Sequence, residues 1–598
     1  MVRVLPDVAG LDKSFDYLVP PPWRDQVRVG TRVRVPLHGR RVGAWVIETA
    51  VSPPAGVTLK PVARITGLGP SAGLIDLAGW AAWRWAGRRS SLLRTASPPT
   101  AVTALTAGPA SPAAAAPRAV PAAPTGSSTG TVDALAARAL SGPGAVVRLA
   151  PGGDRFPLVA AAVRRGDALV LTPSIDAAGR LAARLRRSGA TVAMAPGEWA
   201  RAAGGATVVG ARAAVWAPVP ELAAVVVLDE HDEAYKEERA PCWHAREVAV
   251  ERARRAGVPC VLVSPCPSLE ALAWVPPGTV LAQPPSEERA GWPVLDVVDR
   301  RREDQVRAGL YSSRLVELLR DPQRGRALCV LNRSGRSMLL ACARCGELAR
   351  CEACASSLAQ PVPGVLACRH CGRQRPVVCR DCGSTVMKNL RVGVSRVREE
   401  LEALVGEPVG ELTGRTAAHD PARQCRVLVG TEAVLHGGPG AAVGVVAFLD
   451  FDQELLAPRY RSGEEAMALL ARAARVLGGR RRDGRLVVQT RLPGHAVVLG
   501  AQRGDPTRVS AEEQPRRAAL GFPPAVAMAV VSGTAAPAFM EALGTAENAA
   551  IPEGVEVLGP SDGRWLVRAP DHRTLCDALA AAPRPPGRLR IEVDPLRA

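Results

Sequence analysis

Eight of the fourteen cysteines in this 598-residue chain fall between residues 342 and 382, as four C-x-x-C pairs. Two thiolates separated by two residues can contact the same ion, and Zn²⁺ prefers four such ligands in a tetrahedron. The cluster therefore predicts two Cys₄ zinc sites. Both are expected to be structural, because four protein ligands leave no open position for catalysis.

The lengths of the loops between the pairs indicate how they combine. Only five residues separate Cys345 from Cys351, and seven separate the third pair from the fourth. Thirteen residues separate Cys354 from Cys368, and this longer connection suits two knuckles that share one ion. The predicted sites are Cys342, Cys345, Cys379 and Cys382 for one zinc, and Cys351, Cys354, Cys368 and Cys371 for the other, nested inside it.

A disulfide framework is the alternative interpretation of these cysteines. The N-terminal residues MVRVLPDVAGLDKSFDY include acidic side chains and lack the apolar stretch of a signal peptide. The other six cysteines are scattered singly, and C-x-x-C repeats in a cytosolic chain are more often metal sites. No stretch approaches eighteen uninterrupted apolar residues, so we expect a cytoplasmic metalloprotein with no membrane partner.

The formal net charge of +19 favours a polyanionic partner, most simply nucleic acid. A GC-rich coding sequence would also enrich arginine, and only Lys13, Lys60, Lys236 and Lys388 are lysines. The charge therefore supports nucleic-acid binding only in part. The scarcity of lysine makes the position of each one informative.

Patterning along the chain predicts a multi-domain α/β protein. Residues 1–70 contain alternating strand-like segments, and the apolar runs after residue 131 alternate with helical stretches, as buried parallel strands do. The predicted domains are a β-rich domain (1–70), a short helical region (71–96), an Ala/Pro-rich linker (97–130), a first α/β lobe (131–300), a second lobe (301–340 and 384–500), the double zinc module inserted into it (341–383) and a C-terminal α+β domain (501–598).

Two tandem parallel lobes raise the possibility of a nucleic-acid helicase, whose phosphate loop must end in Gly-Lys-Ser/Thr. The candidate loop has Gly152 and Gly153, but Asp154, Arg155 and Phe156 follow where Gly-Lys-Thr is needed. No lysine occurs between Lys60 and Lys236 to supply another loop. The sequence thus speaks against productive ATP hydrolysis and against ATP with Mg²⁺ as a cofactor.

Several short motifs together resemble one family, the primosomal replication-restart proteins of the PriA type, which are relatives of superfamily-two DNA helicases. The resemblance covers nearly the whole chain, and it implies helicase-like folds for the two lobes. The motifs are KSFDYLVP (13–20), GTRVRVP (30–36), GRRVGAWV (39–46), LDEHDEAYKEERAPCWHAREVA (228–249), SPCPSLEA (264–271), LNRSGRS (331–337), VGTEAVLHG (429–437), LGFPP (520–524), VLGP (557–560) and IEVDP (591–595).

The chain departs from this family at the positions that serve ATP. Alignment on His231 places Leu228 at the Mg²⁺-binding aspartate and Asp229 at the catalytic glutamate. In LLARAARVLGGR (469–480), Val476 and Gly479 fall at the two family arginines, with Arg472 and Arg475 nearby. Together with the phosphate loop, these departures resemble the actinobacterial type of the family, which has a degenerate helicase core.

The resemblance also implies a pocket for the 3′ end of DNA. Phe15, Asp16, Tyr17, Gly39 and Lys60 stand at its matching positions. Asp16 would accept a hydrogen bond from a free 3′-hydroxyl, Phe15 and Tyr17 would offer faces to a base, and Lys60 would neutralise a phosphate. Gly39 would allow close backbone approach. Alternatively, the two aromatic residues are core residues of a small β domain. The helical region 71–96 would be a shortened winged-helix domain.

The function that the resemblance implies is recognition of stalled or branched forks, followed by primosome assembly and reloading of the replicative helicase. The expected partners are forked DNA with a 3′ end, primosome proteins, the replicative helicase and its loader, and single-stranded DNA-binding protein, at the nucleoid. Loss of the nucleotide motifs favours a scaffold without helicase activity. The alternatives are an active ATP-dependent 3′–5′ helicase and a zinc-ribbon protein of transcription or RNA metabolism.

Overall fold

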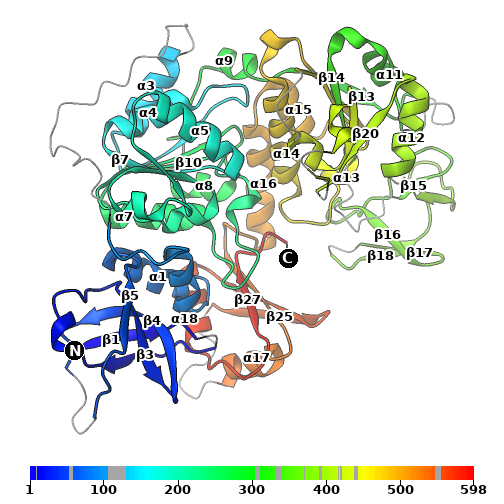
Figure 1. The fold of residues 1–598 in the computed structure, drawn as a ribbon. Helices are drawn as coiled ribbons and strands as arrows, with labels where there is room; N and C mark the ends of the chain where they lie inside the picture. The colour runs from blue at the N-terminus through cyan, green and yellow to red at the C-terminus, as the bar shows by residue number, and fades with distance from the viewer. Residues whose placement is uncertain are drawn as a thin grey trace.

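A computed structural model describes residues 1–8, 10–52, 58–105, 129–303, 310–331, 340–368, 371–389, 394–414, 416–417, 420–436, 442–545 and 554–597. Figure 1 shows two α/β lobes side by side. The N-terminal sheet and the C-terminal domain lie next to each other below the first lobe, and a small β-rich module projects from the second. This arrangement confirms the predicted fold class.

The N-terminal domain is built on a five-stranded antiparallel sheet of order β2-β1-β4-β3-β5. Alternation places Val33 and Val35 in its core and leaves Arg34 exposed. Two helices, α1 (Ala72–Arg84) and α2 (Arg89–Ala96), follow. The strands are β1 (Val2–Pro6), β2 (Phe15–Tyr17), β3 (Arg32–Leu37), β4 (Arg40–Thr49) and β5 (Arg64–Gly67).

The first lobe contains a seven-stranded sheet of order β12-β6-β11-β10-β7-β9-β8, in which every pairing is parallel. Its strands are β6 (Gly144–Arg148), β7 (Asp167–Leu171), β8 (Val192–Ala195), β9 (Thr207–Gly210), β10 (Leu222–Leu228), β11 (Cys260–Ser264) and β12 (Leu281–Ala282). Its helices are α3 (Thr129–Ala139), α4 (Phe156–Arg164), α5 (Ile175–Arg187), α6 (Trp199–Ala203), α7 (Ala245–Ala256), α8 (Leu269–Trp274) and α9 (Pro285–Ala290).

Both faces of this sheet are buried, as β10 illustrates. Val225 and Val227 enter a core that continues into α1, α2 and the C-terminal sheet, whereas Val226 and Leu228 enter the core beneath α3, α4 and α5. A parallel sheet covered on both faces explains the continuous apolar run in the sequence. The first of these cores also joins the first lobe to the terminal domains.

The second lobe contains a six-stranded parallel sheet of order β13-β23-β22-β14-β21-β20. Its strands are β13 (Val294–Asp299), β14 (Arg326–Val330), β20 (Val409–Leu412), β21 (Val427–Gly430), β22 (Val443–Phe448) and β23 (Arg485–Thr490). Its helices are α11 (Ser313–Arg320), α12 (Val394–Val405), α13 (Asp452–Leu455), α14 (Ser462–Leu477) and α15 (Ala496–Arg503).

The cysteine-rich module is inserted between β14 and α12. Its first and last strands, β15 (Leu340–Cys342) and β19 (Met387–Asn389), pair antiparallel at the base of the insertion. The other strands, β16 (Leu358–Val362), β17 (Val365–Cys368) and β18 (Gln374–Pro376), form a separate three-stranded sheet. The inserted module thus leaves the parallel sheet of the lobe uninterrupted.

The C-terminal domain follows a helix, α16 (Thr507–Leu520), that lies between the lobes in Figure 1. Its four-stranded antiparallel sheet has the order β25-β26-β24-β27. The elements are β24 (Ala527–Ser532), α17 (Ala536–Thr545), β25 (Glu556–Ser561), β26 (Arg564–Ala569), α18 (His572–Ala581) and β27 (Arg590–Val593).

Three of the predicted domain boundaries need correction. Strand β13 was placed in the first lobe by the boundary at residue 300, but it pairs with β23 of the second sheet. Val509 lies beyond the boundary at residue 501, yet it belongs to the apolar core of the second lobe. Residues 97–102 are attached to the first domain, because Trp45 Nε1 donates to Ser97 Oγ at 2.8 Å and Leu68 N–H donates to Val102 O at 2.7 Å.

Other predicted segments lie outside the described residues. These are most of the linker, residues 106–128, and all of the LNRSGRS motif after Leu331. We keep the other predicted domain boundaries as a proposal.

Candidate functional sites

The eight clustered cysteines form two groups of four in the structure. Within each group the sulfur atoms lie within 4.8 Å of one another. The groups are Cys342, Cys345, Cys379 and Cys382, and Cys351, Cys354, Cys368 and Cys371. The spacing between the C-x-x-C pairs predicted the same two sets.

The geometry of each group fits a metal ion. Cys342 Sγ lies 3.5 Å from Cys382 Sγ, and Cys351 Sγ lies 3.4 Å from Cys371 Sγ, near the spacing of about 3.8 Å that four sulfurs around Zn²⁺ require. The Arg344 N–H also donates to Cys342 Sγ at 3.4 Å. Burial opposes ionisation of Cys342, but backbone N–H groups and the neighbouring thiols outweigh it and lower its pKa to about 6. Within the same group the pKa of Cys345 is raised, so the sulfur spacing carries the assignment: each group could hold one metal ion.

The knuckles themselves are local structures set by the backbone. The residue after three of the C-x-x-C pairs is a glycine with positive φ, Gly346, Gly372 and Gly383. Each glycine N–H donates to the carbonyl of the first cysteine of its pair at 3.0 Å. Ala355 makes the same turn in the remaining knuckle at φ +58°, a conformation that costs an L-residue more than glycine.

The residues predicted to bind a DNA 3′ end lie on and beside β2. Phe15, Asp16 and Tyr17 form this strand, and its register opposite β1 places Asp16 next to Arg3. Lys60 lies nearby, because the Leu18 N–H donates to Lys60 O at 3.0 Å. Gly39, at φ +76°, is in the turn between β3 and β4, and no atom outside its chain neighbours comes within 4 Å of a Cβ placed on it.

Strand alternation separates these side chains. Phe15 and Tyr17 face the domain core, where Tyr17 is 5% exposed and donates its hydroxyl to Pro36 O at 2.9 Å. Tyr17 therefore does not present a stacking face, in contrast to the prediction. Asp16 faces outward and is bound by Arg3, with Arg3 Nε 2.9 Å from Asp16 Oδ1. Arg3 was missed in the sequence, because only the strand register reveals its partner.

In the loop at the phosphate-loop position, residues 150–155, the N–H groups of both glycines are already bound. The Gly152 N–H donates to Gly291 O at 3.0 Å, and the Gly153 N–H donates to Ala150 O at 2.9 Å. The Phe156 N–H donates to Asp154 Oδ1 at 3.0 Å. A phosphate needs such donors free at the start of the helix. Asp154 also adds a negative charge, which Arg184 pairs at 2.6 Å.

Asp229, the residue aligned with the catalytic glutamate, is held by arginines from both lobes. Arg155 Nη1 lies 2.5 Å from its Oδ2, and Arg475 Nη2, on α14, lies 2.6 Å from its Oδ1. Burial would raise the pKa of Asp229, but the charges of Arg475 and Arg155 outweigh burial and lower it. The carboxylate is therefore ionised and fully engaged.

The residues around Asp229 are also engaged in contacts within the protein. Leu228 is buried at the end of β10, where its carbonyl accepts from the Tyr235 hydroxyl at 2.6 Å. Arg472 pairs with Asp232 across the lobes at 2.9 Å. A Cβ placed on Gly152 would lie 2.8 Å from Gly479 N, so the two lobes are in direct backbone contact here. The side chain of Val476 packs against the second-lobe core.

Comparison with known proteins places this architecture in a family. The family model described as 3′DNA-binding domain (3′BD) of PriA matches residues 3–98, and the Primosomal protein N C-terminal domain model matches residues 518–596. The probable replication restart protein PriA of Mycobacterium leprae is 31% identical over 609 residues, which cover 94% of this chain and 91% of that protein. The chain belongs to the PriA family.

Other relatives match over a shorter region. The replication restart protein PriA of Treponema pallidum is 33% identical over 350 residues, which cover 55% of this chain. The matched region spans about half the length of this relative and of the Bacillus subtilis PriA, 52% and 43% respectively. Among solved structures, a Mycobacterium smegmatis helicase Lhr bound to ssDNA and AMP-PNP aligns at 16% identity and a TM-score of 0.36, covering 65% of this chain and 51% of that one.

The family assignment places α1 and α2 within the matched 3′DNA-binding segment. In the motif LDEH (228–231), Glu230 is fully buried and accepts from Arg246 Nη1 at 3.0 Å and from Ser268 N–H at 2.8 Å. Among the described residues of this PriA-family chain, no helix combines the length and apolarity needed to cross a bilayer.

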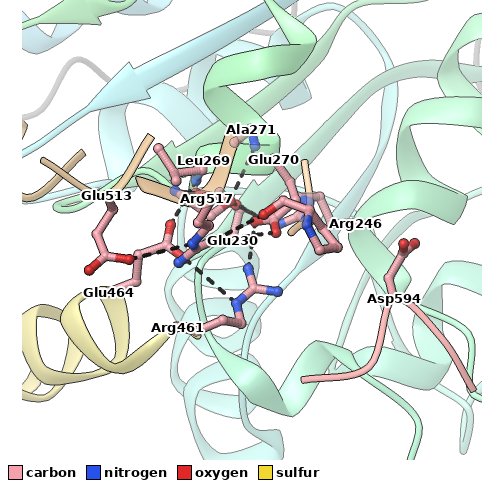
Figure 2. Close-up of polar contacts among 12 residues, drawn as sticks. Glu230, Arg246, Leu269, Glu270, Ala271, Arg461, Glu464, Glu513, Arg517 and Asp594 are labelled. Atoms are coloured by element: carbon pink, nitrogen blue, oxygen red, sulfur yellow. Dashed lines mark hydrogen bonds and ion pairs between the residues drawn. The ribbon is translucent and has the colours of Figure 1, made fainter. Parts of the chain in front are cut away.

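A second cluster of ion pairs, missed in the sequence, joins the lobes beside Glu230 (Figure 2). Arg461 Nη2 lies 2.5 Å from Glu270 Oε2, and the Leu269 N–H donates to Glu464 Oε1 at 2.8 Å. Arg517, which is 1% exposed on α16, pairs with Glu464. Glu270 belongs to the first lobe and Arg461 and Glu464 to the second, so α16 and both lobes meet in one buried network.

Proposed function

We propose that this chain is a DNA-binding replication-restart protein that recognises stalled or branched forks and promotes primosome assembly without hydrolysing ATP. Membership in the PriA family and the match to the 3′DNA-binding domain support the DNA-binding and restart roles. One observation carries the rest of the proposal. Asp229, at the position of the catalytic carboxylate, is engaged by Arg155 and Arg475.

A nucleotide motor needs several groups that are free to act on ATP. Its carboxylate must orient water, its second-lobe arginine must reach the γ-phosphate, and its loop must cradle phosphates. Here the N–H groups of Gly152 and Gly153 are bound to protein carbonyls, and Arg475 is bound to Asp229. Leu228 offers no oxygen for Mg²⁺. Each part of the site is committed to a contact within the chain.

DNA-stimulated ATP hydrolysis is the direct test. We expect hydrolysis by the purified full-length protein to stay at the no-enzyme rate with or without forked DNA, and to be unchanged in Arg155→Ala. The matched control is Arg503→Ala, an exposed arginine on α15. Robust fork-stimulated turnover that Arg155→Ala abolishes would refute the proposal and establish the alternative, an active helicase.

The inserted module is the proposed docking platform for partner proteins, with two zinc ions as structural cofactors. A hollow of about 460 Å³ lies between the two cysteine groups and is lined by charged side chains of both signs. The charged lining residues are Glu347, Arg350, Glu352, Arg375, Arg380 and Asp381. The proposed partners are primosome proteins, the replicative helicase with its loader, and single-stranded DNA-binding protein.

A further inference from the structure

Arg3 stands at the centre of a ladder of charges on the outer face of the N-terminal sheet. Val2 and Val4 point into the core, so Arg3 points outward between them. Its register partners are Asp16 on β2 and Glu48 on β4.

The guanidinium group of Arg3 contacts both acids at once. Nε lies 2.9 Å from Asp16 Oδ1, Nη2 lies 3.3 Å from Asp16 Oδ2, and Nη1 lies 2.8 Å from Glu48 Oε2. The Asp16 side chain is only 13% exposed, whereas the Glu48 side chain is 54% exposed. The fork of two bonds fixes the plane of the Asp16 carboxylate, and Glu48 fixes Arg3 from the other side.

This geometry leaves Asp16 able to accept further hydrogen bonds. Each carboxylate oxygen has two lone-pair sites, and the fork uses one on each oxygen. The remaining sites suit a hydroxyl donor such as a free 3′-hydroxyl. A bare carboxylate would also repel the phosphates next to that end, and Arg3, which is shared with Glu48, offsets part of this repulsion.

We propose that Arg3 is a positioning and specificity-determining residue of the DNA-end site, which orients Asp16 toward the 3′-hydroxyl and offsets part of its charge. This inference rests on the proposed recognition of DNA 3′ ends. Because Arg3 is the cation nearest to Asp16 in the register, it also explains how an acidic residue can belong to a phosphate-rich interface.

The test measures the affinity of full-length protein for forks that end in a 3′-hydroxyl or a 3′-phosphate. We expect Asp16→Ala to release Arg3, so that this variant binds 3′-phosphate forks about tenfold more tightly than the wild type does. Adding Arg3→Ala should remove that gain. Arg3→Ala alone should weaken binding to 3′-hydroxyl ends as much as Asp16→Ala does, because the Asp16 carboxylate is no longer held in place. Arg3→Lys should restore the charge but not this binding, because an ammonium lacks the fork.

The matched control is Arg94→Ala, which breaks the ion pair with Asp7 in the same domain and should leave the preference unchanged. Thermal melting and metal content establish that each variant is folded, and Arg3→Gln provides a side chain of similar length. Wild-type affinity for 3′-hydroxyl forks in both Arg3→Ala and Arg3→Gln would overturn the role of Arg3 alone. A wild type that binds both ends equally would overturn end recognition itself, and the role of Arg3 with it.

Discussion

At the scale of a single residue, Asp229 connects the two lobes through its ion pairs. Its side chain is 4% exposed and has one arginine partner in the first lobe and one in the second. Removing one partner from a buried ion pair typically costs about 3–5 kcal/mol, because the remaining charge stays desolvated. Arg155 would remain in contact with Asp229 if Arg475 were lost, so the cost here should lie at or below the low end of that range.

Arg475→Ala should lower the free energy of unfolding by about 2–3 kcal/mol at pH 7. The pKa of Asp229 is lowered in the folded protein. The stabilisation is therefore present above the ordinary aspartate pKa of about 3.9, and it is lost as the pH falls through the lower folded pKa. Urea unfolding of wild type and variant between pH 7 and pH 3 measures the difference.

Arg503→Ala controls for loss of an exposed arginine and should change little at any pH. An unfolding free energy of Arg475→Ala equal to that of the wild type at pH 7 would contradict the assigned ion pair.

At the scale of elements, the inserted module is held by one helix of the main body as well as by its own base. Arg516, on α16, donates from Nη2 to Cys354 O at 3.0 Å, and the Ser357 N–H donates to Leu456 O at 3.4 Å. The nested metal site is thus the one in contact with the helix that lies between the lobes. Its loss should affect partner docking before it affects DNA binding.

The double variant Cys351→Ser, Cys354→Ser should reduce the zinc content from two ions per chain to one, because one group of four cysteines is left with only two. Primosome assembly should fail, and binding to DNA ends should be retained. Metal analysis and fork binding measure the two effects. Cys425→Ser, outside both groups, should keep two ions; normal assembly by the one-zinc variant would argue against docking through the module.

The sequence predicted this module and the parallel strands well, because both are local. C-x-x-C spacing specifies a knuckle, and an apolar run such as residues 223–228 specifies a buried strand. It did not predict that Arg475 binds Asp229, since the two residues are 246 positions apart in the chain and only the placement of the lobes brings them together. Likewise, the partner of Arg3 depends on the register of the strands, and the burial of Tyr17 depends on which side chains face the core. The residue pattern of a short strand does not specify either.

At the scale of the whole molecule, the domains meet at the last residue of β27 and the two residues that follow it. Asp594 Oδ2 pairs with Arg84 Nη2 of α1 at 2.6 Å. Lys236 of the first lobe donates to Val593 O at 2.5 Å, and the Tyr460 hydroxyl of the second lobe donates to Pro595 O at 2.7 Å. Three successive residues therefore touch the DNA-end domain and both lobes, so a change in any of these parts acts on the same short segment.

Asp594→Ala should destabilise the protein by about 3 kcal/mol, because Arg84 is 5% exposed and would lose its partner. The melting curve should then resolve separate transitions for the terminal domains and the lobes. Differential scanning calorimetry measures both effects. Asp562→Ala removes an exposed aspartate that also has positive φ and serves as the control. Equal melting of the two variants would rule out the segment as a joint.

The paired strands at the base of the zinc module have a consequence for the order of assembly. Leu340 lies opposite Asn389, so the chain leaves the second lobe and returns to it at one place. Closing such an excursion costs entropy that grows only slowly with its length. The second lobe can therefore fold around the inserted module before that module binds any metal. Under zinc starvation we expect a protein that still binds DNA ends but does not recruit partner proteins to them. Supplying zinc alone should restore this recruitment.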